Sequence, residues 1–227
     1  MKPEVILALD VKDIKDAEQF VDKLYPKIKI FKVGSQLFTA YGPRVVEMIR
    51  KKGAEVFLDL KFFDIPNTVA NAVAAAVGLG VKMMTLHILG DEEMLKSAVK
   101  AADEEAKRQK VKRPLLIGVT VLTSREATSS DVLTLAKIGI ESGLDGVVSS
   151  VVEVTLLKQE IKKKFVVVTP GIRSAGAAVN DQKRTATVRQ AAIAGSDYLV
   201  VGRPILSSAD PLAAAEEILG ELDGRTD

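Results

Sequence analysis

The chain has 227 residues, 47% of them hydrophobic, with 32 Lys and Arg against 30 Asp and Glu and no cysteine. This charge balance lacks the surplus expected for binding nucleic acid or an anionic membrane, and the absence of cysteine excludes disulfides, thiolate nucleophiles and Cys-ligated metals. We therefore expect a small-molecule partner and a single domain over residues 1–227, because no linker-like change of composition divides the chain.

The first apolar run of the chain covers residues 5–9 and is the first of eight predicted β-strands. It ends at Asp10, so it is too short for a signal peptide or a membrane span, and we expect a cytoplasmic protein. The other predicted strands are short apolar runs at residues 28–33, 54–60, 82–86, 115–119, 146–148, 165–168 and 198–201. Such continuous runs are typical of parallel strands that are covered on both faces.

Segments with helical periodicity lie between these strands. Apolar residues recur at helical spacing from Ile14, Val45, Val69 and Met94, and Asp13 stands where a helix cap is expected. Parallel strands need crossover helices of this kind. Eight strand–helix units in this length predict an α/β fold, a closed (β/α)8 TIM barrel, rather than an open doubly wound sheet.

Polar residues at or just after the predicted strand ends are candidates for one site, because barrel active sites gather at that face. Asp10 follows the first strand, Lys32 lies near the end of the second, Asp59 and Lys61 end the third, and Thr123 follows the fifth. Residues two apart on a strand share a face, and charges there are costly unless paired. The alternative for Asp59 and Lys61 is a structural ion pair that closes a strand end.

Two loops late in the chain predict an anion site. Pro170-Gly-Ile-Arg173 follows the seventh predicted strand, and Gly202-Arg203-Pro204 follows the eighth. Phosphate sites in such barrels often combine these two loops with a helix N-terminus. Gly202 lets the backbone approach a ligand closely, Arg203 offers a bidentate guanidinium, and Arg173 is positioned to supply another. A surface arginine at a turn is the ordinary alternative.

Several motifs together resemble the orotidine 5'-monophosphate decarboxylase family in its bacterial form. They are Leu9-Asp10, Phe31-Lys-Val-Gly34, Asp59-Leu-Lys-Phe-Phe-Asp-Ile-Pro-Asn-Thr68, Leu122-Thr-Ser124, Thr169-Pro-Gly-Ile-Arg173, Asp181-Gln-Lys-Arg184 and Val201-Gly-Arg203. The Asp-X-Lys-X-X-Asp element is shared with sugar-phosphate relatives, but its combination with Ile-Pro-Asn-Thr and with Lys32 is specific.

The resemblance implies a homodimeric enzyme that converts orotidine 5'-monophosphate to uridine 5'-monophosphate without metal or organic cofactor. It implies an alternating charge network of Lys32, Asp59, Lys61 and Asp64, with Asp64 donated by the second subunit. Lys61 would stabilise and protonate the carbanion at C6. The implied substrate contacts are Asp10 and Lys32 with ribose hydroxyls, Thr68 with them from the partner subunit, Thr123 and Pro170 with the pyrimidine, and Arg173, Gln182, Gly202 and Arg203 with the phosphate.

Three further expectations follow from the same residues. The loop at residues 174–185 is the predicted lid, because it is long and rich in small and polar residues. Phe62 and Phe63 would be exposed in a monomer, so a dimer interface is expected to cover them. His87, the only histidine, is interpreted as a packed residue rather than a general base.

Two alternatives remain open from the sequence. One is a magnesium-dependent sugar-phosphate enzyme that shares the Asp-X-Lys-X-X-Asp element, in which Asp10, Asp59 and Asp64 would be oxygen ligands. The other is a non-catalytic sensor of nucleotides or phosphosugars on the same fold. Lys32 and the Ile-Pro-Asn-Thr extension argue against the first.

Overall fold

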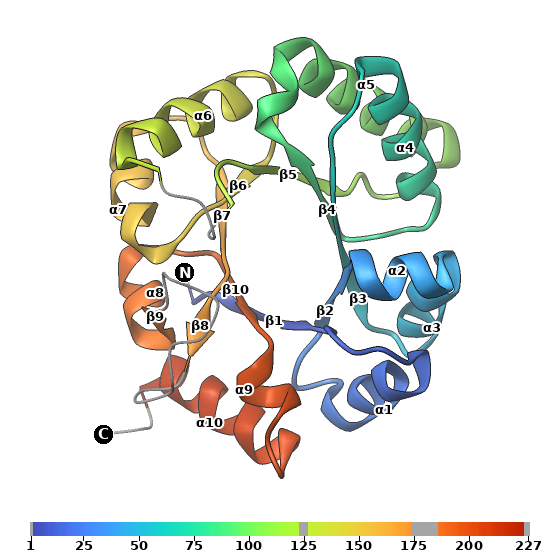
Figure 1. Cartoon of the computed structure of the whole chain (residues 1–227), viewed down its shortest axis with the longest axis vertical. Coiled ribbons are helices and arrows are strands. Elements are labelled where there is room, and N and C mark those ends of the chain that lie inside the picture. The colour runs from blue at the N-terminus through green and yellow to red at the C-terminus, as the bar shows by residue number, and fades with distance from the viewer. Residues whose placement is uncertain (1, 123–126, 174–185, 225–227) are drawn as a thin grey trace.

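Eight parallel strands close into a barrel surrounded by helices, which confirms the predicted (β/α)8 architecture (Figure 1). The computed structural model describes residues 2–122, 127–173 and 186–224. Around the barrel the strands follow the order β1-β10-β7-β6-β5-β4-β3-β2. Their bounds are β1 Glu4–Ala8, β2 Ile30–Gly34, β3 Glu55–Phe62, β4 Met83–His87, β5 Leu115–Val119, β6 Gly146–Val148, β7 Val166–Thr169 and β10 Tyr198–Val201.

The eight predicted strands agree with these bounds to within two residues at each end, because each apolar run is buried on both faces. Two further strands, β8 (Ile172–Arg173) and β9 (Ala186–Thr187), form a small parallel pair beside the barrel. The sequence did not predict this pair, since two residues carry no readable period.

Helices cover the outside of the barrel and connect the strands (Figure 1). Asp13 caps α1 by accepting a hydrogen bond from the backbone N–H of Lys15 at 2.8 Å, as its position predicted. The helices are α1 Ile14–Leu24, α2 Ser35–Tyr41, α3 Pro43–Lys51, α4 Pro66–Gly78, the 3₁₀ turn η1 Ile88–Gly90, α5 Asp91–Gln109, α6 Ser129–Glu141, α7 Val151–Glu160, α8 Val188–Ala194, α9 Arg203–Leu206 and α10 Pro211–Asp223. Within the described residues, none of these helices has the length and apolar character that crossing a membrane requires.

The interior of the barrel is filled by side chains rather than open as a pore. Alternate residues of each strand face inward, and the others pack under the helices. The buried inner cluster consists of Ile6, Ile30, Phe57, Met83, Ile117 and Val168. Polar side chains that face inward are therefore found toward the two ends of the barrel, above and below this apolar layer.

Candidate active site

A cavity of about 660 Å³ opens at the carboxyl ends of the strands. This is the end at which barrel enzymes bind their substrates. The cavity brings together eight residues that the sequence singled out, from both ends of the chain: Asp10, Lys32, Asp59, Lys61, Pro170, Arg173, Gly202 and Arg203. Apolar side chains from β5, β6, β7 and β10, such as Val119 and Val200, line the rest.

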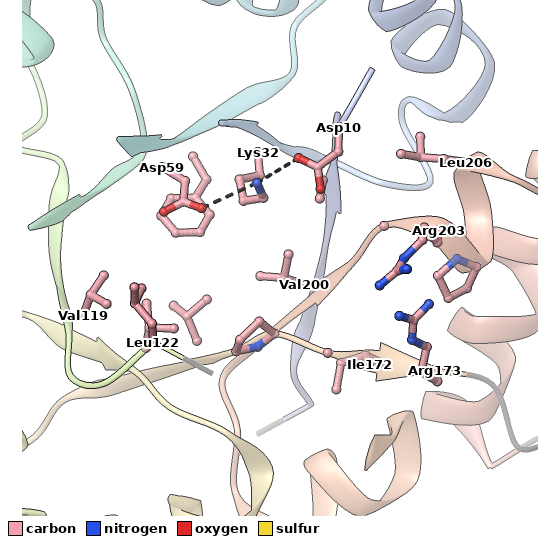
Figure 2. A pocket seen from close by; sticks show the side chains of 18 of the residues that line it. Asp10, Lys32, Asp59, Val119, Leu122, Ile172, Arg173, Val200, Arg203 and Leu206 are labelled. Atoms are coloured by element: carbon pink, nitrogen blue, oxygen red, sulfur yellow. Dashed lines mark hydrogen bonds and ion pairs between the residues drawn. The ribbon is translucent and has the colours of Figure 1, made fainter. Parts of the chain in front are cut away.

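Four charged side chains form a row of alternating sign along one side of the cavity. The ammonium of Lys32 lies 3.2 Å from a carboxylate oxygen of Asp10 and 3.5 Å from Oδ2 of Asp59 (Figure 2). The ammonium of Lys61 donates to Oδ1 of Asp59 at 2.9 Å. The two inner members are the most buried, with the side chains of Lys32 and Asp59 only 11% and 14% exposed.

The Asp59 carboxyl group has a pKa below its usual value of 3.8. Burial raises this pKa, because a charge loses hydration, but the charges of Lys32 and Lys61 and hydrogen bonds from Lys61 and Thr85 outweigh that effect. Asp59 is therefore a fixed negative charge at neutral pH, held between two ammonium groups.

The sequence predicted that Asp59 and Lys61 meet because a regular strand places them on one face. They do meet, but the strand is not regular there. The pairing of β3 with β4 shifts register between Leu58 and Phe62, and Lys61 adopts a left-handed backbone conformation with φ of 53°. Such a conformation is uncommon for a residue with a side chain and is typical of functional positions.

Thr85 is a residue of this site that the sequence did not reveal. It lies on β4, is fully buried, and bonds to both Asp59 and the backbone of Lys61. A single polar residue within the apolar run Met83-Met-Thr-Leu-His87 was the only available signal. That signal is weak, since threonine is an ordinary strand residue.

The two predicted phosphate-binding arginines line the cavity beyond the Asp10 end of the charged row, since β10, which precedes Arg203, pairs with β1. Figure 2 shows their guanidinium groups pointing toward one another, Arg173 from β8 and Arg203 from the start of α9. Pro204 stands in the first turn of α9, as predicted. Both guanidinium groups thus line the same cavity as the row of alternating charges.

Asp64 and Thr68 lie outside the cavity. Both are exposed, Asp64 in the turn after β3 and Thr68 in the first turn of α4. The Asp64 carboxylate accepts a hydrogen bond from the backbone N–H of Ile65 at 2.7 Å. Thr123, Gln182 and the predicted lid at residues 174–185 lie outside the described residues.

The expectation that Phe62 and Phe63 are both exposed was half wrong. Phe62 is the last residue of β3 and packs against the core, partly buried. Phe63 is 59% exposed, next to Ile65 at 67%, and its ring lies 5.5 Å from that of His87. His87 Nδ1 accepts a hydrogen bond from the backbone N–H of Leu89 at 3.4 Å, in keeping with a packed histidine.

The carboxylates of the cavity are separated by ammonium groups. Asp10 and Asp59 stand on either side of Lys32. Throughout residues 2–122, 127–173 and 186–224, no three carboxylate or imidazole side chains converge as a metal ion would require.

A (β/α)8 barrel with charged side chains gathered at the carboxyl ends of its strands defines the class of barrel enzymes. Comparison with known proteins narrows this class, because the model of the Orotidine 5'-phosphate decarboxylase / HUMPS family matches residues 3–218. The chain belongs to this family and is a lyase.

Individual relatives are similar over nearly the whole chain. A Trichlorobacter lovleyi protein named orotidine 5'-phosphate decarboxylase is 46% identical over 232 residues, covering 97% of this chain and 95% of that protein. A Vibrio cholerae protein of the same name is 47% identical, covering 97% and 98%. The crystal structure of orotidine 5'-phosphate decarboxylase from Lactobacillus acidophilus has a TM-score of 0.85 at 37% identity, covering 97% of this chain and 99% of that one.

Proposed function

We propose that this chain decarboxylates orotidine 5'-monophosphate to uridine 5'-monophosphate and carbon dioxide, the last step of de novo synthesis of that nucleotide. We further propose that residues 1–227 act as one catalytic domain and use neither metal nor organic cofactor. The observation that carries the proposal is the row Asp10, Lys32, Asp59 and Lys61 in one cavity with two arginines. The names of the relatives support the choice of substrate.

The chemistry demands charge stabilisation. When carbon dioxide leaves C6 of the pyrimidine, the electron pair of the broken C–C bond stays on C6. No neighbouring group can delocalise this pair. An ammonium group fixed beside that carbon stabilises the developing charge and then supplies the proton that completes the product. Lys61 has this role in the proposal, since Asp59 holds its ammonium at the wall of the cavity.

Asp59 contributes a permanent negative charge. The low pKa of its carboxyl group keeps it ionised, so a substrate carboxylate bound beside it meets electrostatic repulsion. This repulsion falls as neutral carbon dioxide leaves. The size of such ground-state effects is contested, and the prepositioned charge of Lys61 is the larger contribution in our proposal.

The remaining contacts hold the substrate. Arg173, Gly202 and Arg203 bind the phosphate, helped by Gln182, while Asp10 and Lys32 hold ribose hydroxyls and Pro170 and Thr123 flank the pyrimidine. Bidentate arginine–phosphate pairs are strong and oriented. Binding energy from this remote group can be used to close the site around the reacting carbon.

We also propose that the active form is a homodimer in which Asp64 and Thr68 reach the site of the other subunit. Both side chains are exposed and outside the cavity of their own chain. Three exposed apolar residues occur on the neighbouring turns, namely Phe63, Ile65 and Leu89. An apolar surface beside a charged residue of this kind is suited to an interface between subunits.

The test is the ultraviolet spectrum of orotidine 5'-monophosphate incubated with the purified protein and excess chelator. We expect conversion to uridine 5'-monophosphate at the rate seen without chelator. Activity only on sugar phosphates, and only with magnesium, would instead assign the chain to the sugar-phosphate members of its family. Binding of nucleotides without turnover of any substrate would identify a sensor.

A further inference from the structure

We propose that Thr85 is a positioning residue of the active site: its hydroxyl group orients the Asp59 carboxylate and holds the backbone of Lys61. This inference rests on the proposed function, because it assigns a catalytic consequence to that geometry. Thr85 does not line the cavity. It acts through the two residues that do.

The position of Thr85 is fixed by its strand. It lies in the middle of β4, two residues after Met83, which belongs to the apolar layer inside the barrel. Since alternate residues share a face, Thr85 also points into the barrel, one level closer to the cavity. Its side chain is fully buried, so its hydroxyl must find partners within the protein.

The direction of both hydrogen bonds follows from the partners. Thr85 Oγ1 lies 2.9 Å from the backbone nitrogen of Lys61 and 3.0 Å from Oδ1 of Asp59. The N–H of Lys61 can only donate and the ionised carboxylate of Asp59 can only accept. The hydroxyl therefore accepts from Lys61 and gives its single proton to Asp59.

This proton fixes the rotation of the Asp59 carboxylate. Oδ1 accepts from both Thr85 and the ammonium of Lys61, while Oδ2 faces the ammonium of Lys32 at 3.5 Å. Each oxygen of the Asp59 carboxylate thus interacts with a different lysine. Without the hydroxyl, Oδ1 loses one of its two donors. Only the two ammonium groups then restrain rotation of the carboxylate about its last torsion, which is a soft one.

The second bond supports the unusual backbone of Lys61. Between the paired positions on either side of the irregularity, β3 advances from Leu58 to Phe62 while β4 advances only from Met84 to Leu86. The extra residues form a bulge, a feature that re-aims side chains near active sites. The Thr85 hydroxyl accepts the N–H of Lys61 within this bulge and so helps to hold its left-handed conformation.

We expect loss of the hydroxyl to affect turnover more than binding. Thr85→Val keeps the shape of the side chain, removes both hydrogen bonds, and should lower kcat roughly 10- to 100-fold, the range for one hydrogen bond to a charged group. The affinity for uridine 5'-monophosphate should stay close to that of the wild type, because the arginines and ribose contacts are untouched. Thr85→Ser should retain most of the wild-type kcat.

The experiment compares Thr85→Val, Thr85→Ala and Thr85→Ser in steady-state kinetics, in calorimetric binding of uridine 5'-monophosphate, and in thermal unfolding. Thr85→Ser and Thr85→Ala differ by one hydroxyl group, so this pair decides the matter even if Thr85→Val fails to fold. The control is Thr169→Val. Thr169 is equally buried, but its hydroxyl bonds to Ser196 at 2.7 Å and not to the site, so kcat should not change.

Lower kcat in Thr85→Ala with rescue in Thr85→Ser, at unchanged nucleotide affinity, supports the proposal. Equal kcat in the two variants overturns it, and so does a loss of kcat that merely parallels a loss of nucleotide binding. An active wild type with an equally active Thr85→Ala overturns this inference alone. An inactive wild type overturns the proposed function as well.

Discussion

Each end of the barrel carries a lysine between two carboxylates, and Lys32 is buried while Lys82 is partly buried. At the carboxyl end of the strands, which we call the mouth, Lys32 lies between Asp10 and Asp59 at 3.2 and 3.5 Å. At the opposite end, the floor, Lys82 lies between Glu4 and Glu55 at 3.6 and 2.6 Å. The two clusters are similar in charge, and the side chains of their lysines are 11% and 17% exposed.

Their surroundings differ. At the floor, the ammonium of Lys82 stands 5.8 Å from the centre of the Tyr198 ring, and neither residue lines the cavity. At the mouth, a second lysine extends the cluster and the whole row borders the cavity. Burial and charge alone therefore do not distinguish the candidate site from the floor. The adjoining cavity and the extra charge at its edge do, which agrees with the view that perturbed ionisable groups are only candidates for function.

The largest effect should come from Lys61→Ala. Loss of one prepositioned charge should reduce kcat by at least about 10²- to 10³-fold, by analogy with removal of a single oxyanion-hole donor. Steady-state kinetics measure this change, and calorimetry should show that uridine 5'-monophosphate still binds. The melting temperature should stay near that of the wild type, because Asp59 keeps Lys32 and Thr85 as partners. Substantial turnover by this variant would remove Lys61 from the chemistry.

Arg203→Ala tests the part of the cavity that the arginines line. If Arg203 holds the phosphate, its loss should raise KM roughly 10- to 100-fold, the range expected for a charge-assisted pair. The matched control is Arg189→Ala, since Arg189 is exposed on α8 and does not line the cavity. Substrate titrations of both variants decide the question. Equal KM values for the two variants would contradict the phosphate assignment.

Lys82→Met is the corresponding change at the floor. It should lower stability and leave activity unchanged, the reverse of the effect expected at the mouth. We expect the free energy of unfolding to fall by roughly 1–2 kcal/mol, a value reduced from that of a fully buried pair because Glu4 and Glu55 are about half exposed. Urea unfolding measures the loss, and kcat should not change. A large loss of activity in a stably folded Lys82→Met protein would contradict the separation of the two ends.

The smallest effects should be those of pH. Burial lowers the pKa of Lys82, but the hydrogen bond with Glu55 and the charges of Glu4 and Glu55 raise it above 10.5 overall. The contribution of Lys82 to stability is then fully present below about pH 10.5, the pKa in the unfolded state. It is lost as pH rises through the higher pKa of the folded state. The difference in unfolding free energy between wild type and Lys82→Met should be constant from about pH 7 to 9 and shrink only at higher pH.

The charged row at the mouth should respond to pH only in the acidic range. Because the pKa of Asp59 is lowered, its contribution is present above the unfolded value of about 3.8 and is lost as pH falls through the folded-state pKa. Activity measured between about pH 5 and 8 should therefore show no titration of Asp59 in the free enzyme. Such a titration would show that Lys32 and Lys61 do not hold Asp59 as the structure places them.

The sequence predicted the parts of the molecule that depend on local pattern. The apolar runs from Val5 onward predicted all eight barrel strands, and Asp13 predicted the start of α1. The convergence of Lys32 with Arg203 followed from the closed barrel, since strand ends of one barrel share one mouth. These inferences needed no knowledge of individual side-chain contacts.

The features that the sequence missed arise from contacts between strands. The left-handed conformation of Lys61 depends on an irregular pairing with β4, and the period of β3 alone predicts a regular strand. Thr85 acquires its importance only from that irregularity. Phe62 was expected to be exposed beyond a strand that ends at residue 60. The strand instead continues through the bulge and includes Phe62.

The pairing of β1 with β10 joins residues 4–7 to residues 198–201 and so closes the barrel with the strand that is synthesised after its other seven. Asp10, Lys32, Asp59 and Lys61 have all been synthesised long before Arg203. A nascent chain without β10 thus contains these four charged residues and Arg173, but it lacks Arg203 and cannot close the barrel. Contacts so distant in sequence form late and slowly in folding. If the proposed function holds, substrate can therefore stabilise only a chain in which β10 has docked, and the first turnover has to wait for that pairing.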